Sequence, residues 1–355
     1  MAAIPAKQTA VWVDNPSKDA NIYLRDDVPV PIPGDDDVLV KMECSGLCHS
    51  DIYNMAGSHP MDVHIPGHEG VGTVVQLGRR VAQTGLLSLG RRVGIKWIHE
   101  TCGACEICER DETSCPDQHN SGRDRPGTLQ QFVCVPARHA SPIPDGIRSE
   151  MAAPLLCAGL TMYSAIGKSQ TRKGDWIVIQ GAGGGLGHLG IQIAARRGLR
   201  VIAIDGEDKR QLCQTMGASA FFDFCDPELN DKVRSLTSSF GAHAVVCCAG
   251  SEAGYNQAIE LLRGGGTLVC VGLPSNRGYH LPIGPMDMVV RGLTIIGSAV
   301  GTEDEMQELL ELARKGEVVA QVDVLPLARF KEAIEEVKAS KTAGRIVLQM
   351  PGYEE

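Results

Sequence analysis

The chain has 355 residues, of which 43% are hydrophobic and 22% charged, and its formal net charge at pH 7 is -9. This length and composition indicate about two globular domains and exclude a disordered chain, while the acidic balance disfavours a nucleic-acid partner. The first residues form neither a signal peptide nor an Arg-rich transit sequence. No apolar run approaches the ~20 residues that span a bilayer. We therefore expect a cytoplasmic protein without membrane contact, whose 13 cysteines are reduced thiols and metal ligands.

Two patterns of predicted secondary structure divide the chain. Short alternating runs punctuated by proline and glycine, such as 38–42, 72–78 and 90–95, predict mostly antiparallel β structure over the first ~150 residues. Beyond residue 160 the pattern changes to apolar strands that alternate with helical segments, which predicts βαβ units and a parallel sheet. The strands are expected at 175–180, 200–205, 244–248, 267–271 and 295–298, and the helices at 189–197, 209–216, 253–262 and 303–315.

A glycine-rich turn follows the first strand of the second pattern and precedes a helix. Glycines in such a turn let the backbone approach a pyrophosphate, which the helix N-terminus then faces. Asp205 ends the next strand, where a carboxylate would bind a ribose diol and repel a 2′-phosphate, so NAD is favoured over NADP. Ala182 interrupts the strict six-residue fingerprint, and a solvated Asp205 is the alternative interpretation. The candidate residues of the turn are Gly181, Gly183, Gly184, Gly185, Leu186 and Gly187.

Four cysteines lie close together between residues 99 and 118. Cys102, Cys105 and Cys108 have CxxCxxC spacing, and Cys115 follows. Four thiolates so close in sequence predict a closed, tetrahedral structural zinc site. Redox catalysis and four unrelated buried thiols are the alternatives. Most of the remaining cysteines outside this group and the set described next, Cys225 among them, are expected in apolar cores.

A second metal site is expected from three distant segments. Cys48 lies in Gly-Leu-Cys-His-Ser-Asp, His68 in Pro-Gly-His-Glu-Gly, and Cys157 in Pro-Leu-Leu-Cys-Ala-Gly. Three protein ligands that leave a fourth position open are typical of catalytic zinc. Two buried thiols and a turn histidine remain the alternative interpretation.

Together with the four-cysteine lobe, the glycine loop, Ile-Asp-Gly and Gly344-Arg345, these motifs give the chain a resemblance to zinc-dependent medium-chain alcohol dehydrogenases of the microbial and fungal NAD-dependent type. The resemblance runs nearly end to end. It implies an α/β protein with a GroES-like, mostly antiparallel β catalytic domain at 1–160 and 299–355. A Rossmann domain with a doubly wound parallel sheet would occupy 161–298.

By the same resemblance, the enzyme would use two zinc ions per chain and NAD to oxidise an alcohol to an aldehyde or ketone, reversibly, by hydride transfer from a zinc-bound alkoxide. Ser50 would relay the proton, Asp51 would orient His68 or cap a helix N-terminus, and Glu69 would modulate the metal. A small-molecule alcohol or aldehyde is the expected partner, and a homotetramer is favoured over a dimer. The cofactor contacts implied are His49 and Arg345 at the pyrophosphate, Gly272 and Val300 beside the nicotinamide, and also Lys209 and Ser298.

Three departures from the family pattern affect these expectations. The last interval of the cysteine lobe is one residue short, Tyr53 replaces a histidine that passes protons to solvent, and Met55 replaces a tryptophan segment that narrows the pocket. The last change suggests an alcohol larger than ethanol. Three alternatives stay open: an NADP-dependent aromatic or allylic alcohol dehydrogenase, a zinc-free quinone or enone reductase, and a non-catalytic zinc-binding protein.

Overall fold

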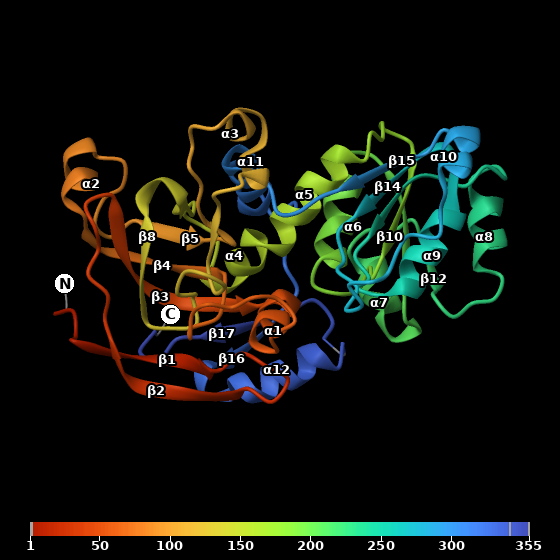
Figure 1. The fold of residues 1–355 in the computed structure, drawn as a ribbon. Coiled ribbons are helices and arrows are strands. Elements are labelled where there is room, and N and C mark those ends of the chain that lie inside the picture. Colours follow the sequence, from red (N-terminus) through yellow and green to blue (C-terminus); the bar gives the residue numbers. More distant parts are fainter. Residues whose placement is uncertain (1–2, 341, 354–355) are drawn as a thin grey trace. The chain divides into compact units, whose positions relative to one another are not determined.

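The computed structural model describes residues 3–340 and 342–353 (Figure 1). The chain forms two compact units. The first consists of Met1–Cys157, Thr302–Gly316 and Ala320–Glu355, and the second of Ala158–Gly301 and Glu317–Val319. The first unit is thus made from the beginning and the end of the sequence.

The first unit contains a seven-stranded sheet in the order β16-β17-β3-β4-β5-β9, with β8 paired to β3. All of its pairs are antiparallel except β16 with β17. Two small antiparallel ribbons, β1-β2 and β6-β7, complete its strands. The bounds are β1 Lys7–Asp14, β2 Asn21–Pro29, β3 Asp37–Leu47, β4 Glu69–Leu77, β5 Arg92–Ile95, β6 Ile98–Glu100, β7 His119–Asn120, β8 Phe132–Pro136, β9 Ser141–Pro142, β16 Val322–Pro326 and β17 Arg345–Gln349.

Strand β17 lies inside this sheet, between β16 and β3. Its run Ile346, Val347 and Leu348 is fully buried, as a strand covered on both faces should be. Helix α12 (Phe330–Lys338) contacts β17, β3 and α1 (His49–Met55). The C-terminal segment therefore supports the strand from which the Cys48 segment emerges.

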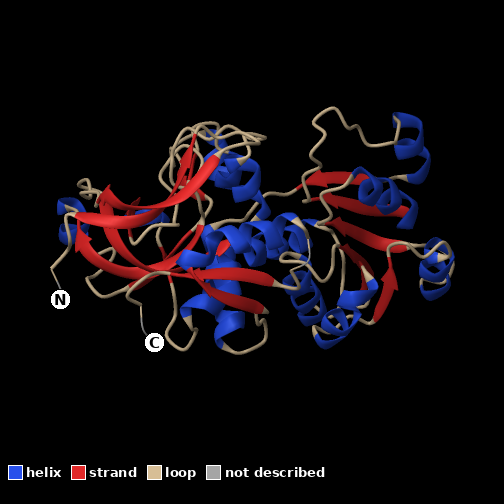
Figure 2. Cartoon of the chain, turned by 90° about the horizontal axis from the view of Figure 1, so that it is seen from below, coloured by secondary structure: helices blue, strands red, loops and turns tan. Residues whose placement is uncertain are grey.

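The other helices of the first unit are short, with one exception (Figure 2). Helix α11 begins with a capping box, in which Thr302 Oγ1 accepts from the Glu305 N–H and the Glu305 carboxylate accepts from the Thr302 N–H. The bounds are α2 Arg79–Thr84, α3 Glu106–Asp111, α4 Ser149–Ala152 and α11 Glu303–Arg314, and the 3-10 turn η3 covers Ala153–Leu156.

The second unit is a parallel six-stranded sheet in the order β12-β11-β10-β13-β14-β15. The chain reverses direction across the sheet at β10 and β13, where nucleotides bind in folds of this type. The strands are β10 Trp176–Gln180, β11 Arg200–Asp205, β12 Ala220–Asp223, β13 Ala242–Cys247, β14 Leu262–Cys270 and β15 Thr294–Gly297. The helices are α5 Ala158–Lys168, α6 Gly187–Arg196, α7 Arg210–Thr215, α8 Leu229–Leu236, α9 Glu252–Leu261 and α10 Pro285–Arg291.

This architecture confirms the expected fold class, with some elements that the sequence patterns missed. Strand β12 has only four residues, helix α2 buries one side chain and helix α10 none, so their core-facing apolar periodicity is weak. Helix α8 is amphipathic but has only eight residues. The expectation that Cys225 lies in a core is wrong, because this thiol is exposed. Within the described residues, no helix has both the length and the apolarity needed to cross a bilayer.

Candidate active site and metal centres

Cys48 lies where strand β3 ends and helix α1 begins. It is the N-cap residue of α1 and has an extended backbone, with φ -106° and ψ 153°. The Asp51 carboxylate accepts a hydrogen bond from the Cys48 N–H at 3.0 Å. Cys48 rather than Asp51 therefore holds the N-cap position, but Asp51 still caps the helix N-terminus as the N3 carboxylate of a capping box.

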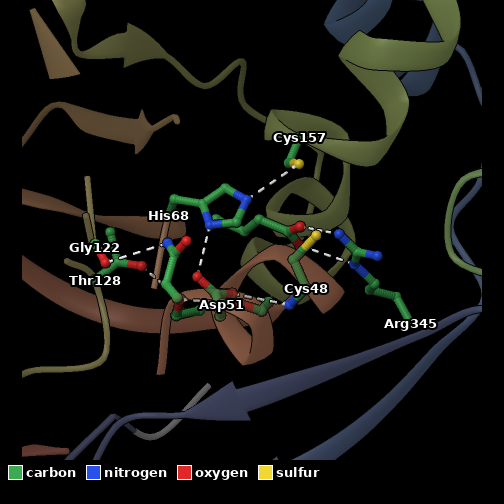
Figure 3. A network of polar contacts seen from close by, with 11 residues as sticks. Cys48, Asp51, His68, Gly122, Thr128, Cys157 and Arg345 are labelled. Atoms are coloured by element: carbon green, nitrogen blue, oxygen red, sulfur yellow. Dashed lines mark hydrogen bonds and ion pairs between the residues drawn. The ribbon is translucent and has the colours of Figure 1, made fainter. Parts of the chain in front are cut away.

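His68 immediately precedes β4, and both of its ring nitrogens have partners (Figure 3). Its Nδ1 lies 2.7 Å from Asp51 Oδ1, and its Nε2 lies 3.2 Å from Cys157 Sγ. A carboxylate accepts the Nδ1 proton, which leaves the Nε2 lone pair of the neutral ring for a metal. The edge of Trp97 also packs against this ring, with 5.1 Å between centroids.

Four possible ligand atoms converge at this site. One atom from each of Cys48, His68, Glu69 and Cys157 lies within 4.8 Å of the others, and all four residues are buried. Cys157 comes directly after η3, so the three expected ligands arrive from three separate segments. Thiolates and an imidazole, with a carboxylate beside them, form a donor set that zinc prefers, and the residues present therefore fit this metal.

The pKa values of the two thiols, Cys48 and Cys157, are shifted in opposite directions. A hydrogen bond from Cys157 and the nearby Arg345 charge hold the pKa of Cys48 well below its ordinary value. The pKa of Cys157 is raised well above its ordinary value by the hydrogen bond with Cys48 and by burial. These opposite shifts favour one thiolate beside one thiol, and zinc, which binds thiolates, would displace the thiol proton.

Glu69 and Arg345 form a buried ion pair beside the thiols (Figure 3). Arg345 Nε donates to Glu69 Oε2 at 3.1 Å, and its Nη2 contacts Oε1. Burial and the Cys48 charge raise the pKa of Glu69 to about 7, against the lowering effect of Arg345. A Cβ on Gly46 would lie 2.1 Å from Glu69 Oε2, so only glycine fits there. The expected contact of Arg345 with a pyrophosphate stays a prediction.

Neighbouring polar side chains fix the backbone around this cluster. Ser45 Oγ and Thr128 Oγ1 are 2.7 Å apart, and Asn54 Nδ2 donates weakly to the Gly122 carbonyl at 3.5 Å (Figure 3). No sequence pattern indicated these contacts, because the partners lie 83 and 68 residues apart in the chain. Met55 belongs to the hydrophobic core at 2% exposure, so this side chain does not support the expectation of a widened pocket.

The four lobe cysteines surround one point. Their sulfurs are separated by 3.7 Å for Cys102 and Cys108, 3.5 Å for Cys105 and Cys108, and 3.6 Å for Cys102 and Cys115. Cys105 also caps α3 by accepting from the Cys108 N–H. Hydrogen bonds from the Ala104 backbone, with other contributions, lower the pKa of Cys102 to about 6. Four thiols at these distances fit a tetrahedral zinc without an open position.

In the second unit, the glycine loop is tied to the end of β11. Asp205 accepts from the Gly183 N–H at 2.7 Å and from the Gly206 N–H at 2.8 Å, and the Lys209 ammonium lies 3.8 Å away. Gly187 must be glycine, because a Cβ would lie 2.3 Å from the Gly181 carbonyl oxygen. A carboxylate with about four lone-pair positions can still accept hydroxyl groups of a ribose.

Three further expected cofactor residues follow β14 and β15. A Cβ on Gly272 would lie 2.6 Å from the Ala249 carbonyl oxygen, so backbone fills the space beside it. Ser298 Oγ is buried without a hydrogen-bond partner among the described residues, and Val300 has a φ of 44°. An unpaired buried hydroxyl and a β-branched residue in the left-handed region are both costly, and such features cluster at ligand sites. The second unit therefore fits a dinucleotide.

Ser50 on helix α1 is half-buried. Near it, the Tyr53 ring lies close to two histidine rings. The Tyr53 ring lies 5.8 Å from that of His49 and 5.5 Å from that of His59, measured between centroids. Tyr53 thus faces a histidine on each side, although it replaces the histidine expected at its own position. The sequence did not indicate His59.

Comparison with known proteins gives a consistent result. A profile described as "Alcohol dehydrogenase GroES-like domain" matches residues 34–145, and one described as "Zinc-binding dehydrogenase" matches residues 185–315. "Alcohol dehydrogenase 2" of Emericella nidulans is 41% identical over 364 residues, with 98% of each chain covered. The chain belongs to the zinc-type alcohol dehydrogenase family.

Solved structures of similar proteins extend this comparison. A structure described as an NAD-dependent alcohol dehydrogenase has a TM-score of 0.87 at 28% identity, covering 96% of this chain and 99% of the other. The acetophenone reductase of Geotrichum candidum in complex with NAD has a TM-score of 0.85 at 28% identity, with 98% of each chain covered. As a zinc-type alcohol dehydrogenase, the protein is an oxidoreductase.

Proposed function

We propose that this protein catalyses the reversible, NAD-linked oxidation of an alcohol to an aldehyde or ketone at a zinc site formed by Cys48, His68 and Cys157. The observation that carries the proposal is the buried convergence of these three ligand atoms, with Asp51 hydrogen-bonded behind His68. When bound, zinc would act as a Lewis acid that acidifies the substrate hydroxyl, and NAD+ would accept the hydride.

The chain's own residues would orient the ligands and move the proton. Asp51 holds His68 in the tautomer that leaves Nε2 for the metal. Ser50, two residues from Cys48, would take the proton from the alcohol. The Arg345 charge compensates the thiolate and the Glu69 carboxylate within the buried site.

Metal analysis and a substrate screen test this function. Two zinc ions per chain and NAD+-dependent oxidation within a panel of primary, secondary, allylic and aromatic alcohols are expected. One zinc per chain, with reduction of quinones or enones and no alcohol oxidation, would instead identify the reductase class that lacks a catalytic zinc. Zinc without dinucleotide binding would identify a non-catalytic zinc protein.

Cofactor choice depends on Asp205 in this proposal. Two similar solved structures, the NAD-dependent alcohol dehydrogenase and the acetophenone reductase in complex with NAD, support NAD over NADP. Asp205→Ser should weaken NAD+ and remove the repulsion of a 2′-phosphate, which shifts the ratio of kcat/KM values toward NADP+. Asp223→Ser, at the end of the neighbouring strand β12, is the matched control. An unchanged ratio in Asp205→Ser would mean that Asp205 does not contact the ribose.

The proposal includes a homo-oligomer, with a second copy covering the β15 edge of the parallel sheet. Edge strands expose unpaired backbone groups that pair readily with another strand. Helix α10, next along the chain before β15, exposes Met286, Val289 and Val290 by 74%, 80% and 75%. Val289→Glu should lower the molar mass measured by light scattering, whereas Val324→Glu, at an exposed valine of the first unit, should not. A tetramer is favoured, and the 13 free cysteines favour a reducing compartment such as the cytoplasm.

A further inference from the structure

His188 is a fully buried histidine, at 0% exposure, in the first turn of α6. Its Nδ1 lies 2.9 Å from the Gly184 carbonyl oxygen, and its backbone N–H donates to the same oxygen at 3.2 Å. Because a carbonyl oxygen only accepts, the ring must carry its proton on Nδ1. His188 therefore binds the glycine loop through a side chain and a main-chain group together.

This contact fixes the orientation of one peptide group in the loop. The peptide bond between Gly184 and Gly185 is planar and trans, so its N–H points opposite to its C=O. The carbonyl is held toward the buried His188 ring, and the Gly185 N–H is consequently directed away from it. Within the described residues, no hydrogen-bond partner for the Gly185 N–H or the Leu186 N–H is found. These are donors of the kind that bind a phosphate at a helix N-terminus.

The loop needs such a contact because glycine restricts its own backbone very little. At its beginning, the loop is fixed by the Ile204 carbonyl, which accepts from Gly181 and Ala182, and by Asp205, which accepts from Gly183. The Gly184 N–H donates within the loop, to the Gly181 carbonyl oxygen at 3.3 Å, and Gly185 lies beyond these contacts. The His188 ring restrains the part of the loop nearest to the helix.

We propose that His188 is a positioning residue for the dinucleotide. Its Nδ1–H holds the Gly184 carbonyl, so that the Gly185 amide of the same peptide group, next to the Leu186 amide, is already oriented toward the pyrophosphate before the cofactor binds. This role deepens the proposed function and rests on it, because the ligand of the loop is taken to be NAD. His188 touches the loop and acts through it.

Two substitutions and one control separate this role from simple packing. His188→Leu keeps a buried side chain but removes the donor. His188→Asn places an amide nitrogen where Nδ1 lies and can restore the hydrogen bond. Gln192→Leu is the control on the same helix, because Gln192 bonds the His188 and Val319 backbones without contacting the loop.

The first measurement is NADH affinity by fluorescence titration of each full-length, zinc-loaded protein. Loss of a hydrogen bond of ordinary strength predicts that His188→Leu raises Kd about tenfold, with KM for NAD+ rising and kcat little changed. His188→Asn should stay within about threefold of wild type. Gln192→Leu should lower Tm and leave Kd unchanged. Equal loss in the Leu and Asn variants, or wild-type affinity in the Leu variant, would overturn the proposal.

The second measurement is amide hydrogen exchange of residues 183–187 in the protein without cofactor. His188→Leu should accelerate this exchange, and His188→Asn and Gln192→Leu should not. If His188→Leu does not fold, a folded His188→Asn with wild-type affinity and exchange supports the role, and a weakened one refutes it. If wild type binds neither NADH nor NADPH, the proposed cofactor is wrong, and unchanged exchange in His188→Leu would separately refute the anchoring by His188.

Discussion

The two cysteine clusters of the first unit are built in opposite ways. Cys48, His68 and Cys157 come from three distant segments, and each is at most 8% exposed. The lobe cysteines all lie between residues 102 and 115, and Cys102 is exposed. Helix α3, which contains Cys108 and is capped by Cys105, buries no side chain.

This difference indicates what holds each cluster together. The distant set is placed by the sheet core and would keep its geometry without a metal. The lobe has little apolar packing of its own, so a bound metal would supply much of its order. Loss of a ligand should therefore affect chemistry at the first cluster and stability at the second.

The largest expected effect is on turnover in Cys157→Ala. Removing one of three zinc ligands should reduce kcat/KM by at least ~1000-fold, with one zinc and the far-UV circular dichroism spectrum retained. Cys44→Ala, at another buried thiol of the same unit, is the control and should remain active. Wild-type turnover in a Cys157→Ala protein that lacks this zinc would end the proposed mechanism.

The second effect concerns the lobe. Cys105→Ser should remove one zinc and lower the free energy of unfolding by roughly 3 kcal/mol, a Tm decrease of several degrees, while turnover per remaining zinc changes little. Calorimetry and metal analysis measure both quantities, with Cys225→Ser as the exposed-thiol control. An unchanged Tm after loss of this zinc would show that the lobe does not depend on its metal.

A third prediction examines proton transfer beside the first cluster. Burial, with a contribution from Cys48, raises the pKa of Tyr53 above 10, so the phenol stays protonated and accepts protons poorly near pH 7. Ser50→Ala should therefore lower kcat/KM by about 100-fold, and Tyr53→Phe by no more than about threefold. Tyr53→His should increase alcohol oxidation below about pH 8. If pH profiles show equal damage in Ser50→Ala and Tyr53→Phe, the phenol takes part in the proton relay.

The smallest expected effect is on the pH dependence of stability, through His139 next to the cysteine lobe. Burial, together with Arg138 and Lys96, lowers the pKa of His139 to about 3, and its Nε2 accepts from the Thr101 N–H at 3.2 Å. The folded state keeps this ring neutral, whereas the unfolded chain protonates it below a pKa of about 6.5. The free energy of unfolding therefore has its full value above that pH and falls as the pH drops below it.

At pH 5 the protonation of this histidine in the unfolded chain lowers the free energy of unfolding by about 2 kcal/mol. His139→Gln keeps an acceptor for Thr101 and should flatten the dependence of unfolding free energy on pH between 5 and 7. Denaturant titrations across that range measure the slope. The exposed His280→Gln should leave it unchanged, and an unaltered slope in His139→Gln would show that another group is responsible.

The sequence predicted local and strongly patterned features best. Five of the six parallel strands were found because runs such as 201–204 are apolar throughout, and the lobe because its cysteines are close in sequence. The Cys48, His68 and Cys157 set, which the structure brings together, was inferred from ligand chemistry and from family resemblance rather than from spacing.

Pairings across long distances in the chain could not be predicted. Glu69 and Arg345 are 276 residues apart, and no local pattern indicates that one neutralises the other. The cap position of Cys48 was missed because cysteine is not a preferred N-cap residue. Helix α10 was missed because its apolar side chains face outward, which gives no core-facing periodicity.

The position of β17 has a consequence for synthesis of the protein on the ribosome. This strand is inserted between β16 and β3 and carries Arg345. At ~5–20 residues per second, translation of the segment 158–301 is complete seconds before Arg345 is translated. The second unit can therefore finish folding first. Until β17 is translated, one edge of β3 lacks this partner strand, and the buried Glu69 carboxylate lacks the Arg345 cation. We expect the nascent chain to need chaperone protection most during this interval, because the Glu69–Arg345 ion pair can form only after residue 345 has been translated.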